Sequence, residues 1–368
     1  MSNIFDYLTW RNDLTFSAVP CCAVDSLIFS CLSYLRLQPI FEQQNRLSIE
    51  NASAVFKEIN ADDIRFRVEK DLQLLHKMAE GTRFSDVTLC GYVDHLDPSL
   101  EKQFSALTCL IDDNYMLITY RGTDNTLVGW KEDFNMTFME TIPSQDEAVQ
   151  YIETMAAAYP HRRILICGHS KGGNLAVYAG AFCSPLIQER IQKIYNHDGP
   201  GFSAGILQTQ GYRSIAQRIE TFVPQSSVVG MLMEHEEHYT VISSTQISLW
   251  QHDPYSWEIL GPDFVRMKNV DKQSILLDST IKHWIGELDR TQREAFIDAV
   301  FQILSNTNAA SFKEMNENRM RSTALILKAL NSTDKQTRKM LSEITLKLMV
   351  SAKCAIEANL TNELPTDK

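Results

Sequence analysis

Hydrophobic and polar residues alternate along the middle of the chain in a pattern that predicts strands separated by helices. Apolar runs typical of strands occupy residues 88–93, 104–111, 115–120, 164–167, 193–196, 218–223 and 239–242. Helical periodicity lies between several of them, most clearly over residues 144–158 and 171–181. Strands that alternate with helices favour a mainly parallel sheet covered on both faces. The pattern therefore predicts an α/β fold with three layers.

Both ends of the chain show a helical pattern instead. Apolar residues recur at helical spacing over residues 7–16, 24–37 and 53–78. From about Asp263 glycine nearly disappears, and helical patterns fill residues 274–288, 292–304, 312–330 and 335–358. Ser144 (in a capping box with Glu147), Thr291 and Thr333 are the predicted helix N-caps. We expect an α/β domain over residues 1–262, which includes the N-terminal helices, and a helical extension over residues 263–368.

The pattern with the strongest chemical meaning is Gly168-His-Ser170-Lys-Gly172, which lies between a buried strand and a helix rich in small residues. Such a sharp turn holds a serine in a strained conformation at the end of a strand, as in a nucleophile elbow. Gly168 and Gly172 remove Cβ atoms where strand and helix pass each other. Ser170 is therefore the predicted nucleophile. An inert serine in a glycine-rich turn is the alternative.

A serine hydroxyl needs a base, usually a histidine that follows it in α/β-hydrolases. The histidines after Ser170 are His197, His235, His238, His252 and His283. His252, in a loop after the last predicted strand, is the predicted base, and a structural histidine in an aromatic loop is the alternative. His235 and His238 are three residues apart among glutamates, but no third ligand has a fixed spacing. We therefore predict a solvated acidic loop there, with no metal and no cofactor.

The positions of the predicted strand ends suggest the acid and one of the oxyanion donors. Asp198 directly follows a predicted strand and precedes a glycine, which favours it as the acid over Asp253 and Asp263. A simple turn-forming role for Asp198 is the alternative. The backbone N–H of Lys171, just after the nucleophile, is a predicted oxyanion donor. The second donor is expected at Gly122-Thr123, after an earlier strand, with the Thr123 hydroxyl as a further candidate.

Composition and charge limit the kinds of partner and the cellular location that we expect. The 368-residue chain is 44% hydrophobic and carries a net charge of −11. Because phosphate binding needs a basic surface, we expect no nucleic-acid partner. The chain shows no secretory signal and no apolar run long enough for a membrane span. Its eight cysteines are scattered, and several lie in apolar runs, which favours buried thiols and a cytoplasmic location.

These motifs resemble two related groups of proteins. Tyr120-Arg-Gly-Thr123, then Trp130 and Asp133, and the elbow itself resemble the class 3 (fungal-type) lipases over residues 104–257. A more specific resemblance, over residues 1–260, is to a lipase-like family of bacterial proteins with no settled function. It is carried by the segments Asp6-Tyr-Leu-x-Trp-Arg-x-Asp13, Tyr34-Leu35, Gly168-His-Ser-Lys-Gly-Gly-Asn-Leu-Ala176, Asp198-Gly-Pro-Gly-Phe202, Val223-Pro-Gln-Ser-Ser227 and Gln251-His-Asp-Pro-x-x-Trp257.

The resemblance implies Ser170 as nucleophile, His252 as base, and Thr123 and Lys171 as oxyanion residues. Fungal-type lipases carry their acid near the position that Ser226-Ser227 fills here. Asp198 then substitutes for it, or the site is a Ser–His dyad, or it is degenerate. The Lys171 side chain replaces the usual leucine. We expect it to face solvent, and contact with an anionic group of the substrate is the alternative. Residues 124–140 would be a lid whose apolar side chains, such as Leu127, Trp130 and Phe134, meet an acyl chain.

Two functions from different classes remain open at this stage. The first is a serine carboxyl-ester hydrolase that acts on an acyl or lipid ester through an acyl-enzyme, with a thioester or a peptide as other substrate classes. The second is a catalytically degenerate hydrolase that serves as a binding or scaffold module. The serines at 226–227 and the four helical segments after residue 263 motivate the second function. Those helices are also a candidate surface for a homo-oligomer.

Overall fold

The computed structural model describes residues 2–59, 64, 66–124, 126–136, 138–227, 229–230, 233, 238–268, 280, 284, 287–305, 325–326, 328–330 and 332–347. Contacts divide the chain into two compact units. The first, here called the α/β unit, contains residues 1–96, 102–122 and 143–270. The second, here called the helical unit, contains residues 97–101, 123–142 and 271–368. The segment expected to be a lid therefore groups with the C-terminal helices.

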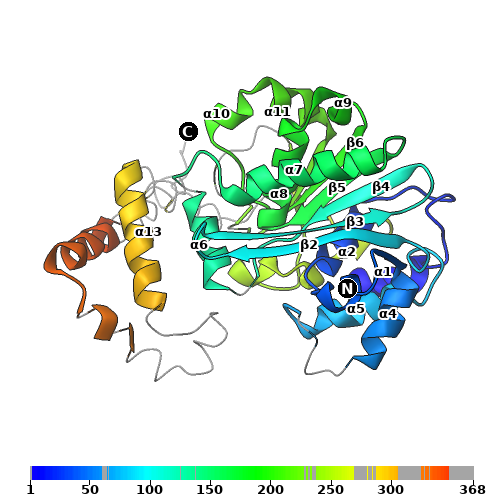
Figure 1. The fold of residues 1–368 in the computed structure, drawn as a ribbon, viewed down its shortest axis with the longest axis horizontal. Coiled ribbons are helices and arrows are strands. Elements are labelled where there is room, and N and C mark those ends of the chain that lie inside the picture. Colours follow the sequence, from blue (N-terminus) through cyan, green and yellow to red (C-terminus); the bar gives the residue numbers. More distant parts are fainter. Residues whose placement is uncertain are drawn as a thin grey trace, which may run out of the picture. The chain divides into compact units, whose positions relative to one another are not determined.

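One eight-stranded sheet, with the strands in sequence order, forms the centre of the fold (Figure 1). Its strands are β1 (Arg46–Ser48), β2 (Thr88–Asp97), β3 (Lys102–Leu110), β4 (Tyr115–Tyr120), β5 (Arg163–His169), β6 (Ile191–His197), β7 (Ile219–Pro224) and β8 (Tyr239–Ile242). β3 pairs with β4 in antiparallel fashion, and β4 to β8 are parallel. A separate antiparallel pair, β9 (Ile259–Leu260) and β10 (Asp263–Phe264), follows. The predicted mainly parallel α/β sheet is confirmed.

Helices cover both faces of this sheet (Figure 1). One face carries α1 (Ile4–Arg11), α2 (Ala23–Leu32), α4 (Ile49–Glu58) and α5 (Glu69–Met78), and the other carries α7 (Pro143–Ala158), α8 (Lys171–Phe182) and α11 (Gln210–Ile215). Successive residues of β5 point to opposite faces: Leu165 joins the core on the α2 side, and Ile166 joins the core on the α8 side. The nucleophile strand is thus buried on both faces, which fixes its position.

Shorter elements complete the two units. They are α3 (Gln38–Phe41), α9 (Pro185–Gln188), α10 (Ala204–Leu207), the 3-10 turns η2 (Ala216–Arg218), η3 (Ser248–His252) and η4 (Pro254–Ser256), and, in the helical unit, α6 (Leu127–Asn135) and α13 (Arg290–Ser305). Within the helical unit α6 packs on α13, where Phe134 and Phe301 have ring centroids 6.0 Å apart. Residues 335–347 are also helical. Most of the predicted helices at 274–288 and 312–330, and the end of that at 335–358, lie outside the described residues.

Three predicted N-caps are wrong, each by one or two residues. α7 begins at Pro143, a residue suited to the first helical position, so Ser144 lies inside the helix. At α13, Asp289 Oδ1 accepts the Gln292 N–H at 2.9 Å, which places Thr291 inside that helix. The Asp334 carboxylate likewise accepts the N–H groups of the first turn that follows it, and Thr333 precedes this cap. In both C-terminal cases an aspartate is the cap, two residues before Thr291 and one residue after Thr333.

The predicted helix over residues 53–78 is two helices, α4 and α5. A helical start is fixed at residue 69 because Asp71 Oδ2 accepts the backbone N–H groups of Arg67 and Val68, at 3.0 and 2.9 Å. Among the described residues, no helix has the length and apolar character that a bilayer crossing requires.

Candidate active site

The turn between β5 and α8 holds Ser170 in a rare backbone conformation. Ser170 has φ 60° and ψ −135°, in the positive-φ region that side chains with a Cβ seldom adopt. Its N–H donates to His197 O at 2.9 Å, and its carbonyl accepts from the Gly173 N–H at 2.8 Å. These bonds maintain the strain, which places the serine at the N-terminus of α8. The side chain lies in a crowded position, because the residue is only 9% exposed.

The glycines on either side of Ser170 are required by close backbone contacts. A Cβ on Gly168 would lie 2.1 Å from Gly172 O, and a Cβ on Gly172 would lie 2.1 Å from Tyr120 O. Gly122, just after β4, is equally restricted, since its Cβ would lie 2.4 Å from His169 O and 3.1 Å from Ser170 Cβ. The missing Cβ atoms therefore allow the end of β4, the end of β5 and the start of α8 to meet at the serine.

Asp198 and His252 contact each other directly. His252 Nδ1 lies 2.6 Å from Asp198 Oδ2, although the residues are 54 positions apart. Since the carboxylate only accepts, Nδ1 carries the proton and Nε2 of the neutral ring is left as an acceptor. Asp198 is fully buried with φ 55°, a second strained position at a strand end. The His252 side chain is 26% exposed.

Ser227 supports this carboxylate from the other side. Its hydroxyl donates to Asp198 Oδ1 at 2.5 Å and accepts from the Gly230 N–H at 3.0 Å. Ser227 thus occupies the region where the resemblance places the acid of fungal-type lipases, and it contacts the acid that comes from the end of β6 instead. The two other candidate acids have separate partners, because Asp253 accepts the Tyr255 N–H and Asp263 pairs with Arg266.

His169 links the candidate nucleophile to the candidate base. Ser170 and His252 form no hydrogen bond with each other in the described part of the chain. The His252 ring instead stacks on the ring of His169, the residue before the nucleophile, with centroids 4.6 Å apart and an interplanar angle of 33°. Hydrogen bonds between catalytic groups are often long before substrate binds.

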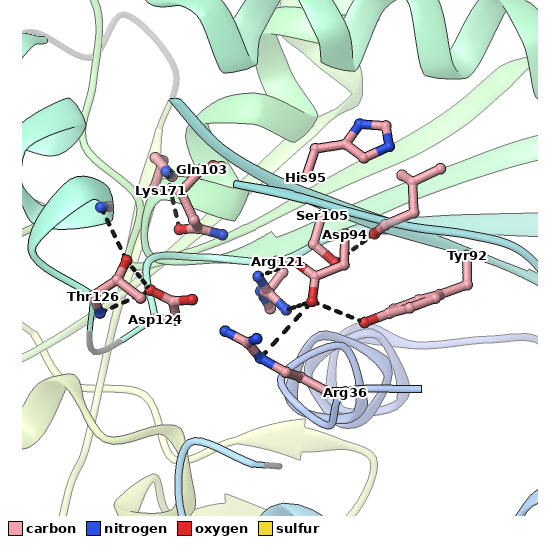
Figure 2. Close-up of polar contacts among 12 residues, drawn as sticks. Arg36, Tyr92, Asp94, His95, Gln103, Ser105, Arg121, Asp124, Thr126 and Lys171 are labelled. Atoms are coloured by element: carbon pink, nitrogen blue, oxygen red, sulfur yellow. Dashed lines mark hydrogen bonds and ion pairs between the residues drawn. The ribbon is translucent and has the colours of Figure 1, made fainter. Parts of the chain in front are cut away.

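Lys171 does not face solvent, so that prediction is wrong. The residue is 1% exposed, and its Nζ donates to the backbone and side-chain oxygens of Gln103, at 2.8 and 3.2 Å (Figure 2). Gln103 lies on β3, so uncharged oxygens of that strand receive the ammonium. The side chain thus ties the first turn of α8 to a neighbouring strand, and only the backbone of Lys171 faces the turn that holds Ser170.

Arg121 and Thr123, on either side of Gly122, have structural partners. Arg121 makes two bonds with the Asp94 carboxylate, at 2.7 and 3.1 Å, and Arg36 approaches the same carboxylate (Figure 2). This ion pair anchors the end of β4 to β2. In the helical unit, the Thr123 hydroxyl donates to the Asp133 carboxylate at 2.6 Å. The Thr123 hydroxyl is therefore engaged by a carboxylate of the same unit.

The three apolar residues expected in a lid lie on α6. Leu127 is buried at 8% exposure, whereas Trp130 and Phe134 are 41% and 40% exposed. The Thr126 hydroxyl caps this helix by accepting the Gly129 N–H at 3.1 Å. Lys131, on the same helix, pairs with Asp298 of α13 at 2.8 Å. The segment is thus an ordered helix of the helical unit with two large apolar side chains partly exposed.

The remaining candidate histidines have other surroundings. His197 is fully buried, its Nε2 lies 2.8 Å from Ser26 Oγ, and burial lowers its pKa to about 3. It is a neutral core residue, as its place at the end of β6 suggests. His238 is exposed just before β8. His235 and His283 lie outside the described residues, and so does most of the predicted acidic loop.

Sequence reasoning assigned no role to His169 or Tyr34. The His169 ring is bound on one side by the Tyr34 hydroxyl and on the other by the His252 backbone, each at 2.9 Å. Position inside the elbow motif was the only available signal for His169. Nothing in the sequence connects it to Tyr34, which lies 135 positions earlier.

Solved structures that are similar to this chain include the following three. An N225Q mutant of MDLA from Penicillium cyclopium has 12% identity and a TM-score of 0.40, over 66% of this chain and 83% of that one. A structure described as a fungal lipase has 11% identity and a TM-score of 0.42, over 70% and 89%. The native Rhizomucor miehei lipase propeptide complex has 14% identity and a TM-score of 0.37, over 65% and 79%.

No curated protein matches the chain. The family model described as Mbeg1-like matches residues 78–302, a range that includes β3 to β8, the elbow and the Asp198–His252 pair. The matched range is more than half of the 368 residues. The protein, whose central sheet is mainly parallel and covered by helices on both faces, therefore belongs to the Mbeg1-like family.

Proposed function

We propose that the protein is a serine carboxyl-ester hydrolase that acts on an acyl or lipid ester through an acyl-enzyme at Ser170. The observation that carries the proposal is the Asp198–His252 contact of 2.6 Å beside a serine held at φ 60°. A buried carboxylate bound to Nδ1 orients a histidine so that Nε2 can accept a proton. A scaffold has no need for a strained serine, a buried acid and an imidazole in one place.

The proposed reaction has two halves, acylation and deacylation, and Ser170, His252 and Asp198 take part in both. Ser170 Oγ attacks the ester carbonyl carbon while His252 Nε2 takes the hydroxyl proton, and Asp198 stabilises the imidazolium that forms. The C–O bond to the alcohol then breaks, and His252 returns the proton to the leaving oxygen. Water repeats the sequence on the acyl-enzyme, which releases the carboxylic acid and restores Ser170.

The oxyanion requires donors at the same turn. The backbone N–H of Lys171 lies at the N-terminus of α8, where unsatisfied N–H groups and the helix dipole favour negative charge. Thr123 is the proposed second donor through its backbone N–H, because its hydroxyl is held by Asp133. The apolar side chains of α6, Leu127, Trp130 and Phe134, are the proposed contacts for the acyl chain.

A series of p-nitrophenyl esters of increasing chain length tests the proposal. The wild type is expected to release p-nitrophenol with an initial burst equal to the enzyme concentration, because the acyl-enzyme accumulates. Ser170→Ala and His252→Ala are the controls, and both are expected to remove the burst and the turnover. A folded wild type with no turnover on any chain length would favour the degenerate scaffold, and turnover unchanged in His252→Ala would remove His252 from the mechanism.

A further inference from the structure

His169 is held at both nitrogens of its ring. Nε2 lies 2.9 Å from the backbone oxygen of His252, and Nδ1 lies 2.9 Å from the Tyr34 hydroxyl. A backbone carbonyl only accepts hydrogen bonds, so Nε2 carries the proton. In the neutral ring Nδ1 then accepts from the Tyr34 O–H. The two partners therefore fix the tautomer and the orientation of a side chain that is 1% exposed.

The surroundings of His169 keep its ring uncharged. Burial is the main cause that lowers its pKa well below the usual value, and His252, Arg67 and His197 act in the same direction. A neutral ring suits this position, because the His252 ring is stacked on it at 4.6 Å and becomes an imidazolium in the proposed reaction. A second charge at that distance would oppose the proton transfer.

The loop that carries the base is held by two ring N–H donors in succession. Trp257 Nε1 donates to Gln251 O at 2.8 Å, and His169 Nε2 donates to the next carbonyl, that of His252. Trp257 is fully buried, and its ring centroid lies 5.9 Å from that of His169. The backbone of residues 251 and 252 is thus fixed to the core, whereas the His252 ring itself keeps partial exposure.

We propose that His169 is a positioning residue that couples the nucleophile to the base. Its own backbone is part of the turn that presents Ser170, and its ring holds the backbone of His252, so one residue sets the separation of the two catalytic groups. It acts through His252 and does not touch substrate. The inference deepens the proposed function and rests on it. A displacement of about 1 Å between reacting groups costs on the order of a hundredfold in rate.

Two substitutions at position 169 separate this role from simple packing. His169→Gln places an amide donor near the position of Nε2, and His169→Asn places one only near Nδ1. We expect kcat of the Asn variant on p-nitrophenyl acetate to fall on the order of tenfold to a hundredfold with KM little changed. The Gln variant is expected to keep most of the wild-type kcat. Equal losses in both variants would overturn the proposal, as would wild-type kcat in both.

A nuclear magnetic resonance experiment reads the same coupling without turnover. In protein labelled with 15N-histidine, the His252 Nδ1–H that contacts Asp198 is expected to give a downfield proton signal, assigned by its loss in His252→Gln. The signal should persist in His169→Gln and disappear or broaden in His169→Asn. An unchanged signal in the Asn variant would contradict the positioning role. This comparison remains decisive if the wild type hydrolyses no ester, so the two proposals fail separately.

Tyr34→Phe provides a milder variant if His169→Asn does not fold. It removes only the hydroxyl that bonds to His169 Nδ1, and the ring contact of Tyr34 with His169 is kept. We expect a severalfold loss in kcat and a broadened His252 Nδ1–H signal, because His169 gains rotational freedom. A kcat and a signal identical to the wild type would contradict the proposal.

Discussion

The elbow and the acid–base pair differ in how their geometry is specified. The elbow lies within five consecutive residues, and its two glycines, Gly168 and Gly172, set its shape by removing Cβ atoms that would lie 2.1 Å from backbone oxygens. The acid–base pair joins residues 54 positions apart, through the end of β6 and a loop after β8. Local sequence therefore defines the turn that holds Ser170, whereas the proposed acid–base pair depends on the packing of the whole sheet. Substitutions in the elbow are expected to lower stability, whereas substitutions in the acid–base pair are expected to lower activity.

The largest expected effect is on activity, at Asp198. Asp198→Asn keeps the volume of the side chain but offers an amide N–H to His252 Nδ1, which favours the wrong tautomer. We expect kcat on p-nitrophenyl acetate to fall by about 10⁴, with the circular dichroism spectrum unchanged. A kcat within tenfold of the wild type would show that the site works as a Ser–His dyad and that Asp198 is not its acid.

The next effect is on folding, at the elbow. Gly172→Ala introduces a Cβ at 2.1 Å from Tyr120 O, and no flexible side chain is present to move away. The free energy of unfolding is expected to fall by about 3 kcal/mol or more, as measured by denaturant titration. Gly205→Ala is the matched control: it lies in α10, and the nearest atom to its Cβ, Ser203 Oγ, is 3.8 Å away. Equal stability of the two variants would contradict the close packing at the elbow.

The third effect is on the pH dependence of the unfolding free energy, and it concerns His197, the residue before Asp198. The pKa of His197 is lowered from 6.5 to about 3 by burial, so the unfolded chain binds a proton that the folded chain does not. The stabilisation by the neutral ring is complete above pH 6.5 and is lost as pH falls toward 3. Between pH 7 and pH 5 this loss amounts to about 2 kcal/mol. His197→Gln should reduce the pH dependence of the unfolding free energy by that amount, and an unchanged slope would argue against a neutral His197.

The smallest expected effect is on kcat, at Ser227, which hydrogen-bonds to Asp198. Ser227→Ala removes the hydroxyl that donates to Asp198 Oδ1 but leaves the contact with His252. We expect kcat to fall by about tenfold, the value of one hydrogen bond to a charged group. Ser214 lies on α11, and Ser214→Ala, which removes its hydrogen bond to Gln188, is the control and should leave kcat unchanged. A Ser227→Ala enzyme as active as this control would limit Ser227 to a structural role.

The contrast between local and long-range contacts also explains which features could be predicted from the sequence. The mainly parallel sheet and the strand–turn–helix at Ser170 follow from local periodicity and glycine placement, and both are found close to the expected positions. The strand end favours Asp198 over Asp253 and Asp263, but the contact of Asp198 with His252, 54 positions away, is visible only in three dimensions. The other two aspartates bond to residues two and three positions along the chain. Lys171 was expected in solvent because lysine usually is; its burial depends on two oxygens of Gln103, 68 positions away.

The central claim is that Ser170 is an activated nucleophile, and active-site labelling tests it most directly. A fluorophosphonate probe is incubated with the wild type, Ser170→Ala, and His252→Ala, and the intact mass and the labelled peptide are then measured. We predict one adduct on Ser170 in the wild type, none in Ser170→Ala, and much slower labelling in His252→Ala. A folded wild type that stays unlabelled, or an adduct on another residue that persists in Ser170→Ala, would contradict the proposed function.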